Sequence, residues 1–349
     1  MSATKTYPGA NALQSSATNR EVRLASRPVG MPTPDDFTLA ETPLRQPADG
    51  ELLVRNLWMS VDPYMRGQMV DQKSYVTPFQ VGEALYGRAV GVVVESRHSD
   101  FAPGDHVFHM LGWREYATGS WEGFEKVDVD QAPAQAYLGV LGAPGLTAYT
   151  GLFRIAELKD GDSVFVSAAA GAVGSVACQL ARAHGCRVVA SAGTDEKCAW
   201  LRDVAGVDAT INYRTCGDLN AALAAAAPEG VDVYFDNVGG GHLEAALNQM
   251  KVFGRIALCG MIGGYNDLAP APGPNNLMLA ISRSLKLQGF VVRHHMDLRP
   301  RFREETSALI RAGKMHVQET VEHGIENAAA AFMKLFTGDN TGKMLVKLA

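Results

Sequence analysis

The chain has 349 residues, of which 47% are hydrophobic, enough for two domains that each bury a core. Its formal net charge of −5 includes no basic excess, which argues against nucleic acid as a partner. It has no run of about 18 apolar residues to span a membrane, and its first residues lack the charged-then-apolar layout of a signal peptide. Five scattered cysteines without a CxxC pair favour reduced thiols. We therefore expect a cytoplasmic protein.

Short β-like stretches broken by Gly, Pro and Asp fill the first part of the chain. After a strand near residues 22–24 they include residues 51–56, 87–95 and 106–108. This spacing predicts a compact barrel or sandwich of strands. The last stretch, residues 328–348, is expected to return to the same domain. The β-rich domain would then comprise residues 1–140 and 315–349.

Strands alternate with helices in the middle of the chain, residues 141–314. Strands are predicted at 163–167, 187–190, 210–213, 231–237, 255–259 and 285–292, and helices at 173–184, 196–204, 219–227, 242–250 and 302–312. The strands are nearly continuous apolar runs, as expected when helices cover both faces of a sheet. This rhythm predicts an α/β fold with a doubly wound parallel sheet of the Rossmann type.

A glycine-containing turn joins the first of these strands to its helix. It runs from Ser167 to Gly174 and contains Gly171, Ala172 and Val173. Such a turn lets the backbone approach a pyrophosphate that sits on the free N–H groups of the helix. Ala169 replaces the usual first glycine, and a Gly/Ala-rich helix start can also serve packing alone. The strand before it and the helix after it favour a dinucleotide site.

The residues after the second strand indicate which nicotinamide cofactor binds. NAD enzymes usually carry an acid there for the ribose hydroxyls, whereas this chain has Ser191 and Ala192. Lys197 follows and can pair with a 2′-phosphate, although it can also belong to a solvated helix face. We therefore expect NADP(H).

A zinc site is not expected. No cysteine precedes Cys178, and His98, His106 and His109 do not form a ligand-spaced set. On a strand, the side chains of the adjacent His294 and His295 would diverge.

In its motifs the chain resembles the zinc-independent medium-chain dehydrogenases/reductases, and within them the prostaglandin, alkenal double-bond and curcumin reductases. The motifs are residues 60–67 (SVDPYMRG), 144–149 (PGLTAY), 168–174, 194–197 (TDEK), 212–215 (NYRT), 236–240 (DNVGG), 259–266 (CGMIGGYN), 289–292 (GFVV) and 338–343 (GDNTGK). The resemblance implies a GroES-like barrel for the β-rich domain, beside the Rossmann domain.

The resemblance also implies roles for individual residues. The pyrophosphate would lie on Gly171, Ala172, Val173 and Gly174, and the adenosine with its 2′-phosphate on Lys197 and Tyr213. Asn237 would contact the cofactor beyond the fourth strand, although Tyr213 and Asn237 can also be read as a core aromatic and a loop cap. The residues expected along the nicotinamide half are Cys259, Gly260, Met261, Ile262, Tyr265, Phe290, Val291, Val292 and Asn340.

The reaction that the resemblance implies is NADPH-dependent reduction of a carbon–carbon double bond conjugated to a carbonyl. Tyr265 is the candidate catalytic residue, as donor to the enolate oxygen, and Tyr64 is the candidate substrate contact. The family often has Met where Ala143 stands, and often an aromatic where this chain continues with Arg293-His294-His295. Both departures affect the shape of the substrate cleft.

Three other functions fit the same pattern: an NADPH quinone reductase, a zinc-free alcohol dehydrogenase and a non-catalytic NADP(H)-binding protein. The expected partner in all enzymatic cases is a small molecule, here an enone or enal. We also expect a homodimer in which the strand at 285–292 pairs across a two-fold axis.

Overall fold

A computed structural model describes residues 18–74, 76–269 and 272–349 of the chain. The chain divides into two compact units. Unit 1 contains Met1–Leu138, Val321–Thr337 and Met344–Ala349, and unit 2 contains Gly139–Thr320 and Gly338–Lys343. The expected division at 140/141 and 314/315 thus differs from the observed one at the C-terminal side. Unit 2 also takes up residues 315–320 and Gly338–Lys343. The first segment hydrogen-bonds to the helix α3 (Gly174–Ala183), and the second hydrogen-bonds to the glycine turn.

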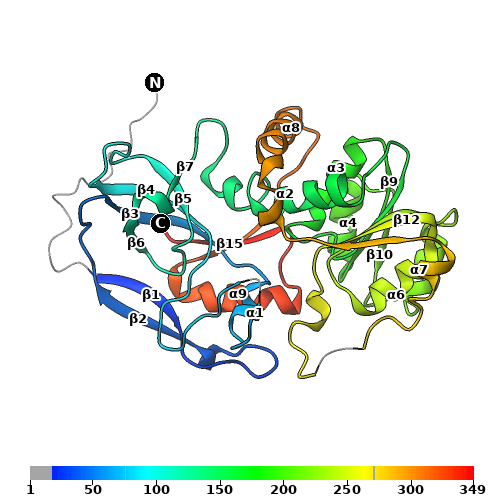
Figure 1. Cartoon of the computed structure of the whole chain (residues 1–349), viewed down its shortest axis with the longest axis horizontal. Coiled ribbons are helices and arrows are strands. Elements are labelled where there is room, and N and C mark those ends of the chain that lie inside the picture. The colour runs from blue at the N-terminus through cyan, green and yellow to red at the C-terminus, as the bar shows by residue number, and fades with distance from the viewer. Residues whose placement is uncertain (1–17, 75, 270–271) are drawn as a thin grey trace. The chain divides into compact units, whose positions relative to one another are not determined.

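Unit 2 is built on a six-stranded sheet in the order β10-β9-β8-β11-β12-β13. Figure 1 labels β9, β10 and β12 of this sheet. Neighbouring strands of this sheet run parallel to each other. Numbered within the sheet, this order is 3-2-1-4-5-6, the order of a Rossmann fold, with its switch point between β8 and β11. The predicted doubly wound sheet is confirmed. Its strands are β8 (Ser163–Val166), β9 (Arg187–Ala192), β10 (Ala209–Asn212), β11 (Val231–Asp236), β12 (Met250–Leu258) and β13 (Lys286–Gly289).

Helices connect these strands as the apolar pattern predicts. The helices α5 and α6 pack on the sheet through Leu223 and Leu243, which join a core with Phe165 and Tyr234. The helices of unit 2 are α2 (Ala143–Tyr149), α3 (Gly174–Ala183), α4 (Asp195–Asp203), α5 (Leu219–Ala226), α6 (Gly240–Gln249), α7 (Leu279–Ser282) and α8 (Arg299–Arg311). A π-helical segment, Thr150–Ile155, continues α2.

The last strand is shorter than predicted. We expected a strand at 285–292, but β13 ends at Gly289, and a 3-10 segment follows at Val292–Leu298. The apolar run continues past the point where β12 ends at Leu258, the partner of Gly289, so no backbone remains beside it to extend the ladder.

Unit 1 contains an antiparallel β-rich fold, as predicted. One sheet runs β14-β15-β3-β4-β5-β7 with β6 beside β3, and β1 pairs with β2. The bounds are β1 (Thr18–Leu24), β2 (Phe37–Pro43), β3 (Glu51–Ser60), β4 (Ala89–Ser96), β5 (His106–His109), β6 (Tyr116–Ser120), β7 (Glu125–Lys126), β14 (Glu319–His323) and β15 (Lys343–Lys347), with the helices α1 (Met65–Gln68) and α9 (Ala328–Thr337).

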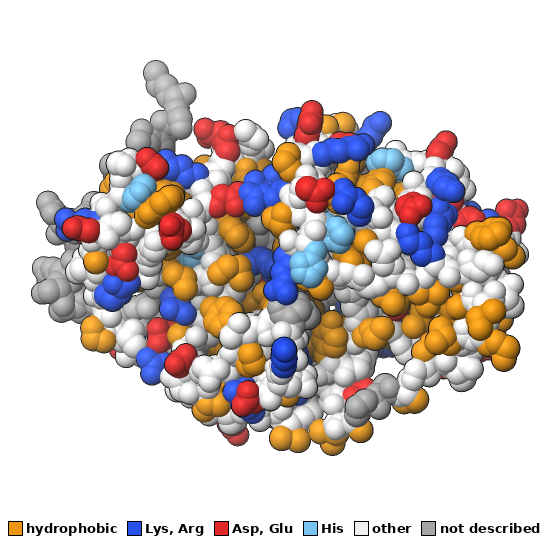
Figure 2. Space-filling view, in the orientation of Figure 1, with side chains coloured by type: hydrophobic (Ala, Val, Ile, Leu, Met, Phe, Trp, Pro, Cys, Tyr) orange, Lys and Arg blue, Asp and Glu red, His pale blue; other side chains and the backbone are white. Residues whose placement is uncertain are grey.

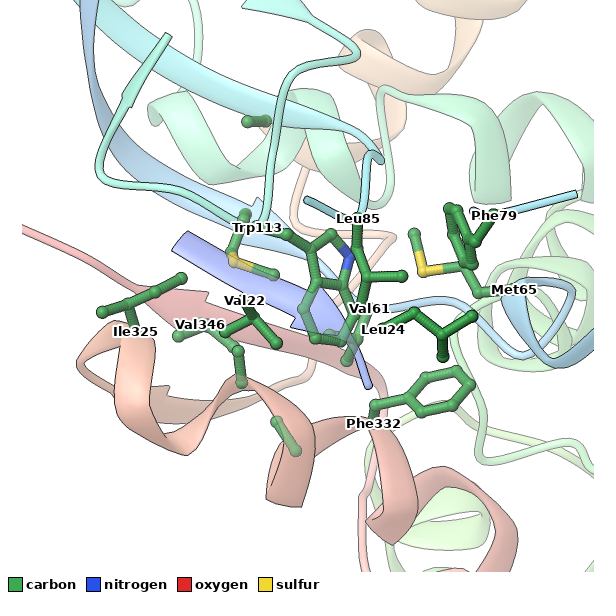
Figure 3. Packing of buried hydrophobic residues seen from close by; sticks show 14 of the residues in the cluster. Val22, Leu24, Val61, Met65, Phe79, Leu85, Trp113, Ile325, Phe332 and Val346 are labelled. Carbon is green, nitrogen blue, oxygen red and sulfur yellow. The ribbon is translucent and has the colours of Figure 1, made fainter. Parts of the chain in front are cut away.

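The main core of unit 1 joins both ends of the chain. Trp113 is fully buried, and Figure 3 shows it among Val22 and Leu24 of β1 and Phe332 of α9. The rings of Trp113 and Phe332 meet edge to face at 6.1 Å. The C-terminal helix therefore completes the N-terminal unit, which is why this domain is discontinuous. Among the described residues no helix is both long and apolar enough to cross a bilayer.

Candidate functional site

The glycine turn lies at the carboxyl end of β8 and opens directly into α3. Ala168 adopts a left-handed backbone, with φ 45°, and its carbonyl accepts the N–H of Gly171 at 3.0 Å. A Cβ atom on Gly174 would lie 2.5 Å from the Ala168 oxygen and 2.7 Å from the Ala169 Cα. Gly174 is therefore needed for the close packing of helix on turn, as the sequence predicts. The turn leads into the N-terminus of α3, a place where an anion binds favourably.

The turn is tied to the next strand at the switch point of the sheet. The amide Nδ2 of Asn237 donates to the Ser167 carbonyl at 2.7 Å, and the Asn237 backbone N–H donates to the Ser167 hydroxyl at 3.0 Å. Asp236 is buried, and its Oδ1 accepts N–H groups from Val238 and Gly239. Burial raises the pKa of Asp236, although these hydrogen bonds oppose the rise. The side chain of Asn237 thus holds two strand ends together, in line with the loop-cap alternative.

A basic pocket forms where β9 and β10 end. Thr194 caps α4 by accepting the Lys197 N–H, and the Lys197 ammonium donates to the Gly338 carbonyl at 2.7 Å. A Cβ atom on Gly193 would lie 2.8 Å from the Tyr213 hydroxyl and 3.3 Å from Arg214 Nε. The pKa of Lys197 is lowered, first by burial and then by the positive charge of Arg214. Two cations that disfavour each other in this way would be stabilised by an anion between them.

Arg214 is the residue that the sequence analysis did not assign. It stands next to Tyr213 in the NYRT motif, directly after β10. Its guanidinium lies next to Gly193 and Gly338, so this arrangement brings together the ends of β9 and β10 and the turn after α9. The Asp195 carboxylate accepts the amide of Asn212 at 2.7 Å, whereas the charge of Asp339 raises the pKa of Lys197 and so opposes the effect of Arg214.

The loop after β12 wraps back over the end of β11. The backbone N–H groups of Cys259 and Gly260 both donate to the Asp236 carbonyl, and Ile262 donates to that of Asn237. Burial raises the pKa of the Cys259 thiol to about 12, so this cysteine is a neutral packing residue. Met261 is exposed to 47% at the head of the turn.

Tyr265 follows that turn and lies near Gly260. A Cβ atom on Gly260 would lie only 3.3 Å from the Tyr265 hydroxyl oxygen. The half-buried Tyr265 therefore presents its phenol at the carboxyl edge of the sheet, where ligands of such folds bind.

Phe290 packs behind this edge together with Phe235 of β11. Their rings meet edge to face with centroids 6.5 Å apart. Gly151, in the π-helical segment, allows this contact, since a Cβ atom there would come within 2.9 Å of Phe290 Cζ. His295 reaches the other side of the Phe290 ring, also at 6.5 Å. Val291 and Val292 are both half-buried, at the start of the 3-10 segment that carries Arg293 and His294. Ala143, where the family often has Met, is the half-buried first residue of α2.

Asn340 lies close to the glycine turn. Its Nδ2 donates to the Gly342 carbonyl at 2.9 Å, and the Gly342 N–H donates to the Ala170 carbonyl at 2.7 Å. Gly338, two residues earlier, borders the basic pocket. Asn340 therefore stands between the basic pocket and the glycine turn, and its expected contact with the nicotinamide stays a prediction.

Tyr64 belongs to unit 1, where a cation holds it. The guanidinium of Arg88 lies 5.3 Å from the centre of its ring and 3.4 Å from its hydroxyl. Asp62 pairs with Arg88 at 3.3 Å and accepts the Ser60 hydroxyl at 2.8 Å. This network fixes the orientation of the phenol within its unit.

Comparison with known proteins identifies the family. The family profile described as the N-terminal domain of oxidoreductase matches residues 20–127, and the profile described as zinc-binding dehydrogenase matches residues 172–311. Prostaglandin reductase 1 of Bos taurus is 44% identical over 91% of this chain and 96% of its own. The NADPH-dependent curcumin reductase of Escherichia coli is 39% identical over 95% of this chain and 97% of its own.

The chain belongs to the prostaglandin, alkenal and curcumin reductase family of medium-chain dehydrogenases/reductases. Among solved structures, CurA from Vibrio vulnificus in complex with NADPH superposes on this family member with a TM-score of 0.90. That protein is 38% identical, and the alignment covers 95% of this chain and 99% of CurA. The motifs that indicated the resemblance are thus confirmed as a family relationship.

The profile described as zinc-binding dehydrogenase matches the chain although the described residues contain no group of metal-binding side chains. In residues 18–74, 76–269 and 272–349, no three His, Cys, Asp or Glu side chains are grouped to hold a metal ion.

Proposed function

We propose that this reductase binds NADP(H) along the carboxyl edge of the unit 2 sheet and reduces the carbon–carbon double bond of α,β-unsaturated ketones or aldehydes. The observation that carries the proposal is the order of groups along that edge. Lys197 and Arg214 form a basic pocket at one end, the glycine turn follows, and the Tyr265 phenol lies at the other end. The names of the relatives, which include an NADPH-dependent curcumin reductase, support it.

The residues present fit such a cofactor. Gly174 lets α3 start close against the turn, and the lack of a side chain at Gly193 keeps the space beside Tyr213 and Arg214 clear. Lys197 and Arg214 would hold the 2′-phosphate, and Tyr213 the adenosine. The N-terminus of α3, with the backbone of Gly171 to Val173, would hold the diphosphate, and Asn340 would lie against it. Phe290, packed on Phe235, would back the nicotinamide.

Tyr265 is the group that acts on the substrate in this proposal. NADPH, when bound, supplies a hydride that the β carbon of the enone accepts. Negative charge then moves to the carbonyl oxygen, and a hydrogen bond from the Tyr265 hydroxyl stabilises that charge. The same hydroxyl can pass a proton to the enolate. Tyr64, held by Arg88, is proposed as a contact for the substrate.

A substrate panel tests the proposal against its alternatives. The purified chain is incubated with NADPH or NADH and an enone, an enal, a quinone, an aldehyde or a primary alcohol. We expect loss of enone absorbance together with NADPH oxidation, and a much slower reaction with NADH. Activity confined to quinones or to the alcohol–aldehyde pair would identify one of the other reductases. Tight NADPH binding without any turnover would indicate a binding protein.

We also infer a homodimer, built on the edge of the unit 2 sheet. β13 is the last strand of that sheet, so one side of it is free for pairing. Apolar side chains are exposed next to it, with Phe253 at 73%, Met278 at 77% and Ile281 at 82%. The Phe253 N–H donates to the Arg283 carbonyl, which joins the two segments that carry these side chains. Figure 2 shows hydrophobic side chains gathered where Figure 1 has α6 and α7.

Such a patch, beside an open strand edge, suits a second copy of the chain. The five cysteines, all within the described residues, are free thiols. That state suits a reducing compartment, and we extend the proposal to the cytoplasm.

A further inference from the structure

The segment Gly338–Lys343 forms an arm that belongs to unit 2, although the chain on either side of it belongs to unit 1. Its first residue offers a carbonyl to the Lys197 ammonium at 2.7 Å. Near its other end the Gly342 N–H donates to Ala170 at 2.7 Å, and Gly342 forms a parallel bridge with Gly171. The arm therefore runs from the basic pocket to the glycine turn, over the part of the site that the cofactor's diphosphate would cross.

The middle of the arm is held by one side chain, that of Thr320. The Thr320 hydroxyl accepts the Thr341 backbone N–H at 3.0 Å and donates to the Thr341 carbonyl at 2.8 Å. One hydroxyl thus satisfies both backbone groups of the residue that follows Asn340. The Lys343 N–H adds a bond to the Gln318 carbonyl at 2.9 Å.

The segment that carries Thr320 is itself fixed to α3. Gln179, 3% exposed, accepts the His316 N–H at 2.6 Å and donates to the His316 carbonyl at 3.0 Å. The helix α3 starts at the glycine turn. Contacts therefore lead from the turn through α3 and residues 316–320 to the arm, which itself returns to the turn. A change at Thr320 would leave Gln179, the turn and the bonds at both ends of the arm in place and free only its middle, at Thr341.

We propose that Thr320 is a positioning residue for the cofactor: by holding Thr341 on both sides it keeps the arm, and with it Asn340, against the diphosphate. This proposal rests on the proposed binding of NADP(H). The diphosphate is common to NADPH and NADH, whereas the 2′-phosphate pocket distinguishes them. Thr320 thus acts on affinity for both cofactors, and Arg214 acts on the preference between them.

The test measures dissociation constants of NADPH and NADH by calorimetry for the wild type and four variants. Thr320→Val removes both hydrogen bonds at nearly constant volume, and we expect it to weaken both cofactors by a similar factor, about tenfold. Thr320→Ser keeps the hydroxyl and should restore affinity. Thr306→Val is the matched control, because Thr306 is fully buried and its hydroxyl has no hydrogen-bond partner. Arg214→Ala should weaken NADPH alone.

Hydrogen exchange of the Gly342 amide gives a second readout. We expect faster exchange in Thr320→Val and wild-type exchange in Thr320→Ser, with unchanged thermal unfolding of the rest of unit 2. If Thr320→Val binds both cofactors as the wild type does, or weakens NADPH alone, the positioning role is wrong. If the wild type itself binds neither cofactor, the proposed function fails instead. If Thr320→Val does not fold, the test uses the serine variant and the exchange rate of the Gly342 amide in the wild type, measured with and without NADPH. If NADPH does not slow that exchange, the proposal is contradicted.

Discussion

Lys197 makes a hydrogen bond outside the proposed phosphate site. Substitutions of Arg214 and Lys197 are therefore expected to change the affinities for NADPH and NADH differently. Lys197 donates to the arm at Gly338 as well as facing the pocket, whereas Arg214 borders the pocket from the strand side. Arg214→Ala should raise the dissociation constant of NADPH about tenfold or more and leave that of NADH unchanged, because one charged contact to the 2′-phosphate is lost. Lys197→Ala should weaken both, and NADPH more strongly.

Titration calorimetry with both cofactors checks this, and Arg202→Ala on the same helix is the control, since Arg202 pairs with its exposed neighbour Asp203. Equal weakening of NADPH and NADH in Arg214→Ala would remove Arg214 from the phosphate site.

Tyr265 is expected to act in the chemical step and little in cofactor binding. Tyr265→Phe removes the hydroxyl next to Gly260 and keeps the ring. We expect kcat to fall by about 10²-fold or more, as when an oxyanion donor is lost, while the dissociation constant of NADPH changes less than about threefold. Single-turnover kinetics with an enone measures the step directly. An unchanged rate would show that the donor is another group.

The turn between β8 and α3 depends on a glycine for steric reasons. Gly174→Ala would bring a methyl group against the backbone of Ala168 and Ala169, so the helix must move away from the strand. We expect a loss of about 1–3 kcal/mol in the free energy of unfolding and a clear loss of NADPH affinity. Gly241→Ala is a matched control, because Gly241 also lies in the first turn of a helix and has open space around it.

Urea unfolding and cofactor titration of both variants make the measurement. If Gly174→Ala unfolds and binds like Gly241→Ala, the packing argument for this turn does not hold.

The sequence predicted well those helices and strands whose residues show a clear local pattern of apolar and polar side chains. The six parallel strands were predicted as buried apolar runs, and the helix predicted at 196–204 corresponds to α4, which Thr194 caps. The strand at β13 was predicted too long, because its end is set by where the partner strand β12 stops. The π-helical segment at Gly151 was not predicted, since it depends on the rings of Phe235 and Phe290.

The site could be predicted only in part for a related reason. The cofactor residues that stand in motifs were proposed by resemblance, and most of those in unit 2 lie along one sheet edge. Arg214 and Thr320 escaped prediction, because each is defined by contacts between segments far apart in sequence. The same holds for the domain boundary, where two short segments near the C-terminus belong to unit 2.

Assembly of the chain is expected to depend on the apolar surface beside β13. Ile281→Asp places a charge in that surface, and we expect it to shift a dimer to monomers at micromolar concentration. Val29→Asp is the control, because Val29 is 86% exposed in unit 1. Light scattering after size-exclusion chromatography gives the mass of each. A monomeric wild type, or a dimer that survives Ile281→Asp, would contradict the proposed interface.

The destination of the hydride tests the proposed reaction most directly. The enzyme is supplied with NADPH deuterated at the nicotinamide carbon that carries the transferred hydrogen, together with an α,β-unsaturated ketone. The product is then examined by NMR and mass spectrometry. Reduction of the double bond, with Tyr265 stabilising the enolate, predicts a saturated ketone with one deuterium on the former β carbon. Deuterium on the carbonyl carbon of an allylic alcohol, or an unlabelled product, would contradict it.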